Sequence, residues 1–204
     1  KKIGSFDSTT TFSFRMAKLV TTVEGGCVAT NSTKIASKIQ MIRNHGRREL
    51  FKEQKHSSKY AFENFGLNMR MIDLLSAIGR VQLNKIQKSL DHRKKIVDLY
   101  KKELSNRFEF QEVPSYVSVH ANMFFGILCN PKRRDNIQNK LMEKGISTRI
   151  TFKPAHLEKW HKKYFHHVHL VNSEKIYSKV LSLPLGNSIS LSQVERVLRV
   201  LRSV

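Results

Sequence analysis

Apolar residues recur at helical spacing along much of the chain. Three isoleucines fall on one face of a helix predicted over residues 34–43, with Ser32 or Thr33 as its cap. The same period runs through residues 65–107 and predicts a long helical stretch of one or two helices. Residues 47–64, which separate these regions, are mostly polar and have no strong period. We expect them to form a surface loop or a subunit contact.

Shorter apolar runs predict strands. Two strands are expected within residues 12–30, on either side of a loop that carries Lys18, with Glu24-Gly25-Gly26 as the turn. Further strand-like runs lie at residues 108–113, 122–129 and 146–152. Strands therefore alternate with helices in the second half of the chain.

Three more helices are predicted after residue 130. The first begins at Pro131 and ends before Gly145, because proline suits the first turn of a helix and glycine suits the position after its end. The second covers residues 173–181, and the third is opened by Ser190. A histidine-rich connection precedes the second.

Positive charge is spread over two predicted domains, residues 1–105 with the long helices and residues 106–204, a small α+β unit. The chain has 37 Lys and Arg against 16 Asp and Glu, a net charge of +21. The first part holds 21 basic and 9 acidic residues, and the second holds 16 and 7. Nucleic-acid binding is therefore an alternative, but no basic tail or recognition motif accompanies the charge. Phosphorylated or nucleotide-bearing substrates suit a basic surface equally well.

Cysteine usage and hydropathy indicate a cytoplasmic protein. Cys27 and Cys129 lie in apolar, strand-like contexts without metal or redox spacing, and we expect both to be reduced core residues. No apolar run reaches the roughly 18–20 residues of a membrane span, and the first residues show no signal-peptide pattern.

Lys18 lies among apolar residues. Phe12, Phe14 and Met16 precede it, and Leu19 follows, so the segment is predicted to be largely buried. A buried ammonium group is costly, and a lysine in such a place is either paired or chemically used as an amine nucleophile. Spacing alone leaves both readings open.

Five sequence blocks, in order, resemble one family. They are "TFSFRMAKLVTTVEGGCVATN", "RNHGRREL", "GLNMRMIDLLSAIGRVQL", "GISTRITFKPAHL" and "LSLPLG". Their order and rough spacing are similar to those of the DegT/DnrJ/EryC1/StrS family of pyridoxal-phosphate-dependent sugar aminotransferases. The resemblance implies an α/β chain of the aspartate-aminotransferase type (fold type I). Residues 1–105 would end the large cofactor-binding domain, and residues 106–204 would form the small domain.

The resemblance assigns the cofactor, pyridoxal 5'-phosphate, to two residues near the start of the chain. Lys18 resembles the catalytic lysine that holds the cofactor covalently, and Ser13 resembles the hydroxyl that binds its phosphate. Relatives that dehydrate instead of transaminating have histidine at the lysine position, so Lys18 favours an aminotransferase. The family usually has glycine where this chain has Val23, so the turn is expected to be shaped differently.

Asn68 matches an asparagine that, in the family, reaches the cofactor phosphate of the neighbouring subunit. The resemblance therefore implies a homodimer with shared active sites. The alternative from the sequence alone is that Asn68 caps the helix that follows.

The substrate pocket is implied in two places. His45 and Arg70 lie in the first half of the chain, and Arg149 and His156 lie in the second. Arg70 can also be a surface charge and His156 a loop histidine. His161 and the three histidines of residues 166–169 lack the spacing of a metal site and have no evident carboxylate partner, so no metal is expected.

The resemblance implies an aminotransferase that moves an amino group, from glutamate, to a nucleotide-linked keto-sugar in amino-sugar biosynthesis. The family's fuller chains carry an N-terminal segment with the phosphate-binding helix start, a ring that stacks on the cofactor and a carboxylate that pairs with its nitrogen. None of these motifs is found here. A catalytically incomplete relative with a binding or regulatory role is therefore a second hypothesis.

Overall fold

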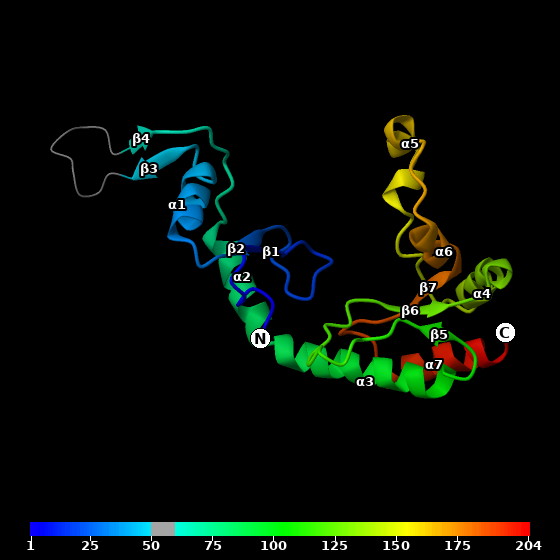
Figure 1. The fold of residues 1–204 in the computed structure, drawn as a ribbon. Coiled ribbons are helices and arrows are strands. Elements are labelled where there is room, and N and C mark those ends of the chain that lie inside the picture. The colour runs from blue at the N-terminus through cyan, green and yellow to red at the C-terminus, as the bar shows by residue number, and fades with distance from the viewer. Residues whose placement is uncertain (50–59) are drawn as a thin grey trace. The chain divides into compact units, whose positions relative to one another are not determined.

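The structure, a computed structural model, describes residues 1–49 and 60–204. The chain divides into two compact units, Lys1–Ile86 (unit 1) and Gln87–Val204 (unit 2) (Figure 1). Nearly all of the long helix α3 (Ile86–Leu104) is thus grouped with unit 2, whereas the sequence placed it in the first domain. The assignment of the two parts as enzyme domains remains a prediction.

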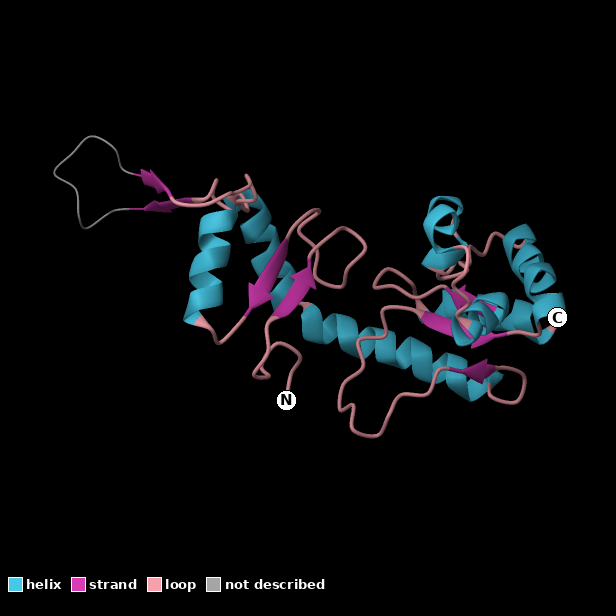
Figure 2. Cartoon of the chain, turned by 45° about the horizontal axis from the view of Figure 1, so that its top comes forward, coloured by secondary structure: helices cyan, strands magenta, loops and turns pink. Residues whose placement is uncertain are grey.

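The described residues of unit 1 form two strand pairs and two helices. Its elements are β1 (Thr10–Ser13), β2 (Gly26–Ala29), α1 (Thr33–Ile42), β3 (Arg47–Glu49), β4 (Tyr60–Phe62) and α2 (Asp73–Asn84). β1 pairs antiparallel with β2, which confirms the two strands predicted around the Lys18 loop (Figure 2). Ser32 caps α1, as predicted, by accepting a hydrogen bond from the Ile35 amide at 3.3 Å. The long helical stretch consists of two helices, separated at Lys85.

The predicted polar loop over residues 47–64 is wrong at both ends. β3 and β4 pair antiparallel, with Arg47 opposite Phe62. Each strand is only three residues long, too short for an alternating pattern, and β3 contains no apolar residue. Residues 50–59 of the predicted subunit contact lie outside the described part of the chain.

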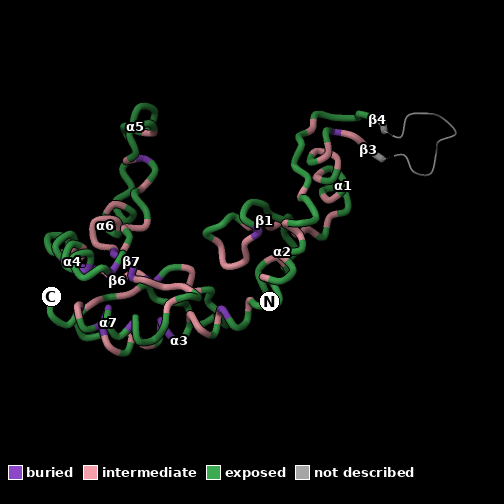
Figure 3. Tube along the Cα trace, turned by 180° about the vertical axis from the view of Figure 1, so that it is seen from behind, coloured by how far each residue is buried: buried purple, intermediate pink, exposed green. Residues whose placement is uncertain are grey.

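Unit 2 contains the hydrophobic core. Its other elements are β5 (Glu109–Phe110), β6 (Phe125–Leu128), α4 (Pro131–Glu143), the 3-10 helix η1 (Ala155–Leu157), α5 (Lys159–Phe165), α6 (Val171–Lys179), β7 (Val180–Leu183) and α7 (Leu191–Arg202). The strands form an antiparallel sheet in the order β5-β6-β7. Buried positions recur along α3, α7, β6 and β7 (Figure 3). Every fully buried apolar side chain in the described part of the chain belongs to this unit.

Several predictions for unit 2 are confirmed. Strands occupy parts of 108–113 and 122–129, α4 follows Pro131 and precedes Gly145, and Ser190 caps α7 in a reciprocal box with Gln193. Cys129 is buried, as predicted, whereas Cys27 in β2 is exposed, against expectation. Cys27 belongs to the two-stranded sheet β1–β2, in which no residue of either strand is buried.

The prediction of a strand over residues 146–152 is wrong. The segment makes a single bridge, in which Arg149 and Ser182 exchange backbone hydrogen bonds of 3.1 and 2.7 Å. β7 itself was not predicted, because its residues follow α6 without a break and continue its apolar spacing. The histidine-rich connection contains the short helix α5, which has no side-chain cap to reveal its start.

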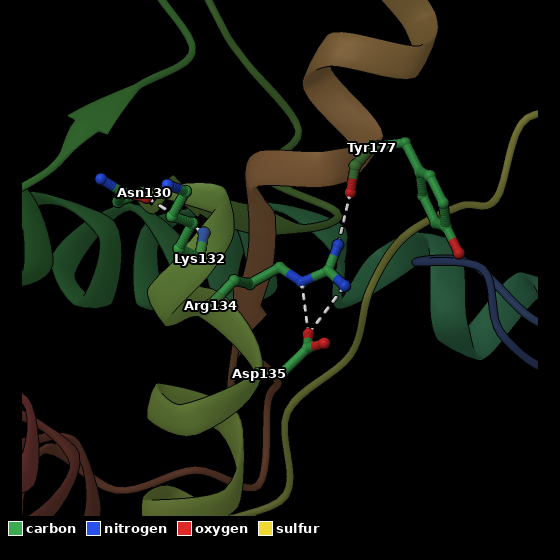
Figure 4. A network of polar contacts seen from close by, with 5 residues as sticks. All are labelled: Asn130, Lys132, Arg134, Asp135 and Tyr177. Carbon is green, nitrogen blue, oxygen red and sulfur yellow. Dashed lines mark hydrogen bonds and ion pairs between the residues drawn. The ribbon is translucent and has the colours of Figure 1, made fainter.

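Arg134 joins α4 to α6 (Figure 4). Its guanidinium donates to the Tyr177 carbonyl at 2.7 Å and to the Asp135 carboxylate at 2.8 Å, and its carbon lies 5.8 Å from the centre of the Tyr177 ring. The Arg134 side chain is 13% exposed, so these bonds are partly shielded from water. They fix the last turn of α6 next to the sheet.

We expect Leu198→Ala to lower the free energy of unfolding of unit 2 by about 2–5 kcal/mol, because it leaves a cavity among fully buried side chains. Trp160 is the single tryptophan and lies in unit 2, so its fluorescence during urea unfolding reports on this unit. Leu191→Ala, at the half-exposed start of the same helix, is the matched control and should cost less than about 0.5 kcal/mol. Equal losses in the two variants would contradict this location of the core.

Candidate functional site

The Lys18 loop, residues 15–21, is closed at its base by backbone hydrogen bonds. The Thr22 amide donates to the Phe14 carbonyl at 2.9 Å, and the Phe14 amide donates to the Gly25 carbonyl at 2.8 Å. Within the loop, the Lys18 amide donates to the Arg15 carbonyl at 2.8 Å. Lys18 therefore lies in a tight turn that projects from the β1–β2 pair.

The Lys18 side chain is half-buried, and its amine has no hydrogen bond or ion pair within the described residues. The prediction that the surrounding segment is largely buried is wrong, since Met16 is 75% exposed. The physical reason is that the loop projects from a two-stranded ladder, and its only fully buried neighbour in the described chain is Thr22 at the base.

Thr22 holds the base of the loop against α2. It is fully buried, and its hydroxyl donates to the Glu24 carbonyl at 2.7 Å. A Cβ atom built on Gly79 of α2 would lie 2.8 Å from the Thr22 methyl carbon, closer than side-chain atoms approach each other. Glycine at position 79 thus lets the loop base and the helix meet. The sequence reasoning missed Thr22, although the Thr-Thr pair after an apolar run was a visible signal.

Val23 adopts a left-handed backbone conformation, with φ of 70°. This region favours glycine and costs a β-branched residue roughly 1–3 kcal/mol. The family resemblance implies glycine at this position, and the sequence analysis expected valine to change the shape of the turn. Val23 instead takes a backbone conformation that is typical of glycine.

Ser13 is the last residue of β1 and is exposed. Its hydroxyl accepts one long hydrogen bond, 3.4 Å, from the Arg15 amide. The lone pair and proton that remain are available to a ligand at the start of the Lys18 loop.

His45 and Asn68 lie where two segments of unit 1 cross at the end of α1. The His45 amide donates to the Leu67 carbonyl at 3.0 Å, and Asn68 forms a bridge with Asn44. The Asn68 side-chain oxygen accepts from Arg70 Nε at 3.3 Å. The structure therefore brings together His45, Asn68 and Arg70, all of them exposed. The cap alternative for Asn68 is wrong, because α2 begins at Asp73.

Two glycines permit this crossing. Gly46 has a left-handed φ of 72°, and its carbonyl accepts hydrogen bonds from the Glu63 and Asn64 amides. A Cβ atom on Gly66 would overlap the backbone of Gly46, and one on Gly46 would overlap the Asn64 carbonyl. The backbones touch directly, so the sequence blocks that begin "RNHG" and "GLN" meet in space.

The other two candidate residues lie in unit 2. Arg149 is exposed, and among the described residues only its backbone is engaged, with Ser182. His156 is 7% exposed, and its Nε2 donates to the Glu174 carboxylate at 2.8 Å. This hydrogen bond, followed by one from the Leu170 amide, holds the pKa of Glu174 below its ordinary value.

Within residues 1–49 and 60–204, no three or more His, Cys, Asp or Glu side chains form a cluster suited to a metal ion. No helix in the same residues has both the length and the apolar character that a membrane span needs.

Comparisons with known proteins give one consistent result. The sequence profile described as the DegT/DnrJ/EryC1/StrS aminotransferase family matches residues 1–202. A UDP-4-amino-4,6-dideoxy-N-acetyl-beta-L-altrosamine transaminase of Campylobacter jejuni is 29% identical, over 100% of this chain and 54% of its own.

Solved structures agree with the sequence match. PseC of Helicobacter pylori, an aminotransferase involved in the biosynthesis of pseudoaminic acid, superposes with a TM-score of 0.86 at 25% identity, over 100% of this chain and 54% of its own. DesV of S. venezuelae gives 0.85 at 25% identity, over 100% and 53%. The chain therefore spans about half the length of the relatives that it matches.

We expect Gly79→Ala to displace the base of the Lys18 loop, because the new methyl group meets the Thr22 methyl group. Such overpacking costs about 1–3 kcal/mol, offset in part by the higher helix propensity of alanine. The measurement is hydrogen exchange of the Thr22 and Phe14 amides, which should become faster.

The matched control is the double variant Thr22→Ser with Gly79→Ala. Serine keeps the hydroxyl that bonds to Glu24 and removes the methyl group, so exchange should return toward the wild-type rate. An unrescued double variant would refute the contact as the cause.

Proposed function

Because the chain belongs to the DegT/DnrJ/EryC1/StrS aminotransferase family, we propose that it supplies the C-terminal part of a pyridoxal-phosphate-dependent sugar aminotransferase. The reaction would move an amino group, with glutamate as donor, to a nucleotide-linked keto-sugar. The observation that carries the proposal is the Lys18 amine, unpaired within the described residues and held in a turn that Thr22 positions against α2.

Lys18 is the proposed catalytic residue. An amine that forms no ion pair in the described chain remains free to attach covalently to the cofactor aldehyde. When bound, pyridoxal phosphate would withdraw electrons from the substrate carbon that gains or loses a proton. Lys18 Nζ would move that proton between the substrate carbon and the cofactor carbon. This role requires the amine to remain close to both carbons, and the tight turn holds it in place.

Ser13 and Asn68 are proposed to bind the cofactor phosphate. Both are polar and exposed, and each has hydrogen-bonding capacity left over after the one side-chain hydrogen bond that it makes among the described residues. Ser13 belongs to the strand that leads directly into the Lys18 loop, so it fits a ligand attached at Lys18. Asn68 is proposed to serve the active site of a partner subunit, as the family resemblance implies.

The substrate would be bound by basic side chains. His45 and Arg70 lie beside Asn68, and the imidazole and guanidinium groups suit the phosphates of a nucleotide-linked sugar. Arg149 and His156 in unit 2 are proposed to contact the same substrate. The net charge of +21 attracts any such phosphorylated ligand at long range and so favours its association with the protein.

A catalytically incomplete relative is the second candidate. In unit 1, no apolar side chain among the described residues is fully buried, and several on α2 and before it are exposed. A unit of this size without buried apolar residues gains little stability from the hydrophobic effect. This supports a need for further polypeptide to cover unit 1 before the site can act, whichever function it has.

Supplied with the N-terminal portion that its relatives possess, the protein should bind pyridoxal phosphate and turn yellow. Borohydride should then trap the cofactor on Lys18 as a stable secondary amine, located by peptide mass spectrometry. Lys18→Ala should abolish the trapped adduct and transamination together. Lys38→Ala, an exposed lysine on α1, is the control and should keep both. An adduct on another lysine, or activity without Lys18, would overturn the assignment.

The same protein should be a dimer by light scattering at low micromolar concentration. If Asn68 acts across the interface, mixing inactive Lys18→Ala with Asn68→Ala subunits should restore activity. Each mixed dimer then contains one site with both defects and one intact site, and random mixing gives about a quarter of the wild-type rate. A monomer, or mixed dimers without activity, would remove the role of Asn68 in a partner's site.

A further inference from the structure

The short helix α5 has one inner face and one uncovered face. His161 and Phe165, four residues apart, line a hollow with mostly apolar walls together with His156, whose proposed role is in substrate binding. Trp160 and Tyr164 are also four residues apart, but they lie outside the described lining of that hollow. They are 65% and 52% exposed, so two large rings face solvent. In unit 2, α5 lies away from the sheet and is mostly exposed (Figure 1, Figure 3).

The two exposed rings form an ordered cluster with a lysine. The ring centres of Trp160 and Tyr164 are 5.0 Å apart, and the ring planes are tilted by 53°. Lys163 Nζ lies 5.6 Å from the centre of the Tyr164 ring. The ring of His161 meets Trp160 nearly edge-on, with centres 5.0 Å apart. We call Trp160, Tyr164 and the three lysines of the helix (Lys159, Lys162 and Lys163) the α5 surface.

Positive charge surrounds the exposed rings. The three lysines of the α5 surface are exposed and form no ion pair within the described residues. Residues 159–173 contain no Asp or Glu. Glu158, which directly precedes the helix, is already paired with Lys153 at 3.1 Å. A partner of the α5 surface must therefore be negatively charged and must also offer an environment that suits aromatic rings.

A lipid surface meets both requirements. Tryptophan and tyrosine rings collect at the membrane–water interface, and lysines extend their charged ends to acidic headgroups. Single-stranded nucleic acid carries the same charge, but its bases stack on free ring faces. The rings of the α5 surface contact each other, and Lys163 and His161 contact them as well. Such a cluster suits insertion among headgroups better than stacking of bases.

We propose that the α5 surface docks the protein on a membrane surface that contains anionic phospholipids. Trp160 and Tyr164 insert among the headgroups, and the lysines of the α5 surface bind lipid phosphates. The binding is peripheral and reversible, because two rings and three lysines bury far less apolar surface than a membrane span does. The surface belongs to unit 2 alone and does not involve Lys18, so this proposal and the proposed transamination can each fail without the other.

The single tryptophan of the chain, Trp160, reports directly on this surface. The full chain is mixed with phosphatidylcholine vesicles that contain about one-third phosphatidylglycerol, at an ionic strength of about 0.15 M. Trp160 emission should move to shorter wavelength and should be quenched by brominated acyl chains, because the ring leaves water. Vesicles of phosphatidylcholine alone should leave the emission unchanged.

Three outcomes of this titration would overturn the proposal. An equal response to both kinds of vesicle would show that charge is not the basis of binding. Cosedimentation with anionic vesicles without a change in Trp160 emission would show that the spread net charge, and not the α5 surface, attracts lipid. No response to anionic vesicles would exclude the membrane, and quenching by single-stranded DNA in that case would identify nucleic acid as the occupant.

Two double variants test the charges and the rings separately. Lys159→Gln with Lys163→Gln should weaken cosedimentation with anionic vesicles by at least about tenfold, because each lysine near the lipid surface adds to the attraction. Trp160→Ala with Tyr164→Ala should weaken it by a similar factor, although every charge remains. All four side chains are exposed, so both variants should keep the wild-type circular dichroism spectrum. Unchanged binding in either variant would refute the α5 surface.

The matched control is Lys132→Gln with Lys140→Gln. These two exposed lysines lie on α4 of the same unit, so the net charge falls by the same amount outside the α5 surface. Binding should change less than about threefold, because charges farther from the lipid than a Debye length are screened. Equal weakening by the control would show that the overall charge of the protein, and not α5, binds the vesicles.

Discussion

The position of the Lys18 amine depends on a contact that leaves no space for a side chain at residue 79. Thr22 closes the Lys18 loop through its backbone, and its methyl carbon lies 2.8 Å from where a Cβ atom of residue 79 in α2 would be. A larger residue at position 79 would force the loop base or the helix to move, and the hydrogen bonds of Phe14 would move with it. Lys18 makes no side-chain bond of its own in the described chain, so its placement rests on the backbone bonds of its loop and on this contact at the loop base.

The two units are stabilised in different ways. Unit 2 buries apolar side chains from α3, α7 and its sheet, with Tyr100 stacked on Phe125 at 5.3 Å and bonded to the Pro184 carbonyl. Unit 1 is organised instead by backbone contacts at glycines, in the loop base and in the crossing of residues 44–46 with 63–68. Such contacts specify geometry but bury little apolar surface. Unit 1, which carries the proposed cofactor site, therefore gains less stability from buried apolar side chains than unit 2 does.

The sequence predicted elements whose signals are local. α1, α4 and α7 have a cap or a proline at the start, and the paired strands around Lys18 have a glycine turn. Elements that depend on partners were missed, including β3 with β4 and β7. For the site, the resemblance directed attention to Lys18, Ser13 and Asn68, whereas Thr22 and Glu174 act through contacts with residues 57 and 18 positions away. Such contacts leave no periodic trace in a sequence.

Lys18 and His156 share one physical arrangement despite lying in different units. In each case, a neighbouring residue fixes the geometry and one nitrogen is left without a partner in the described chain. Fixing a polar group in advance removes the entropy cost of ordering it when a ligand arrives. The difference is in what surrounds the nitrogen. His156 already faces a hollow with apolar walls, whereas the loop of Lys18 is largely uncovered. The amine therefore needs additional polypeptide to become a closed site.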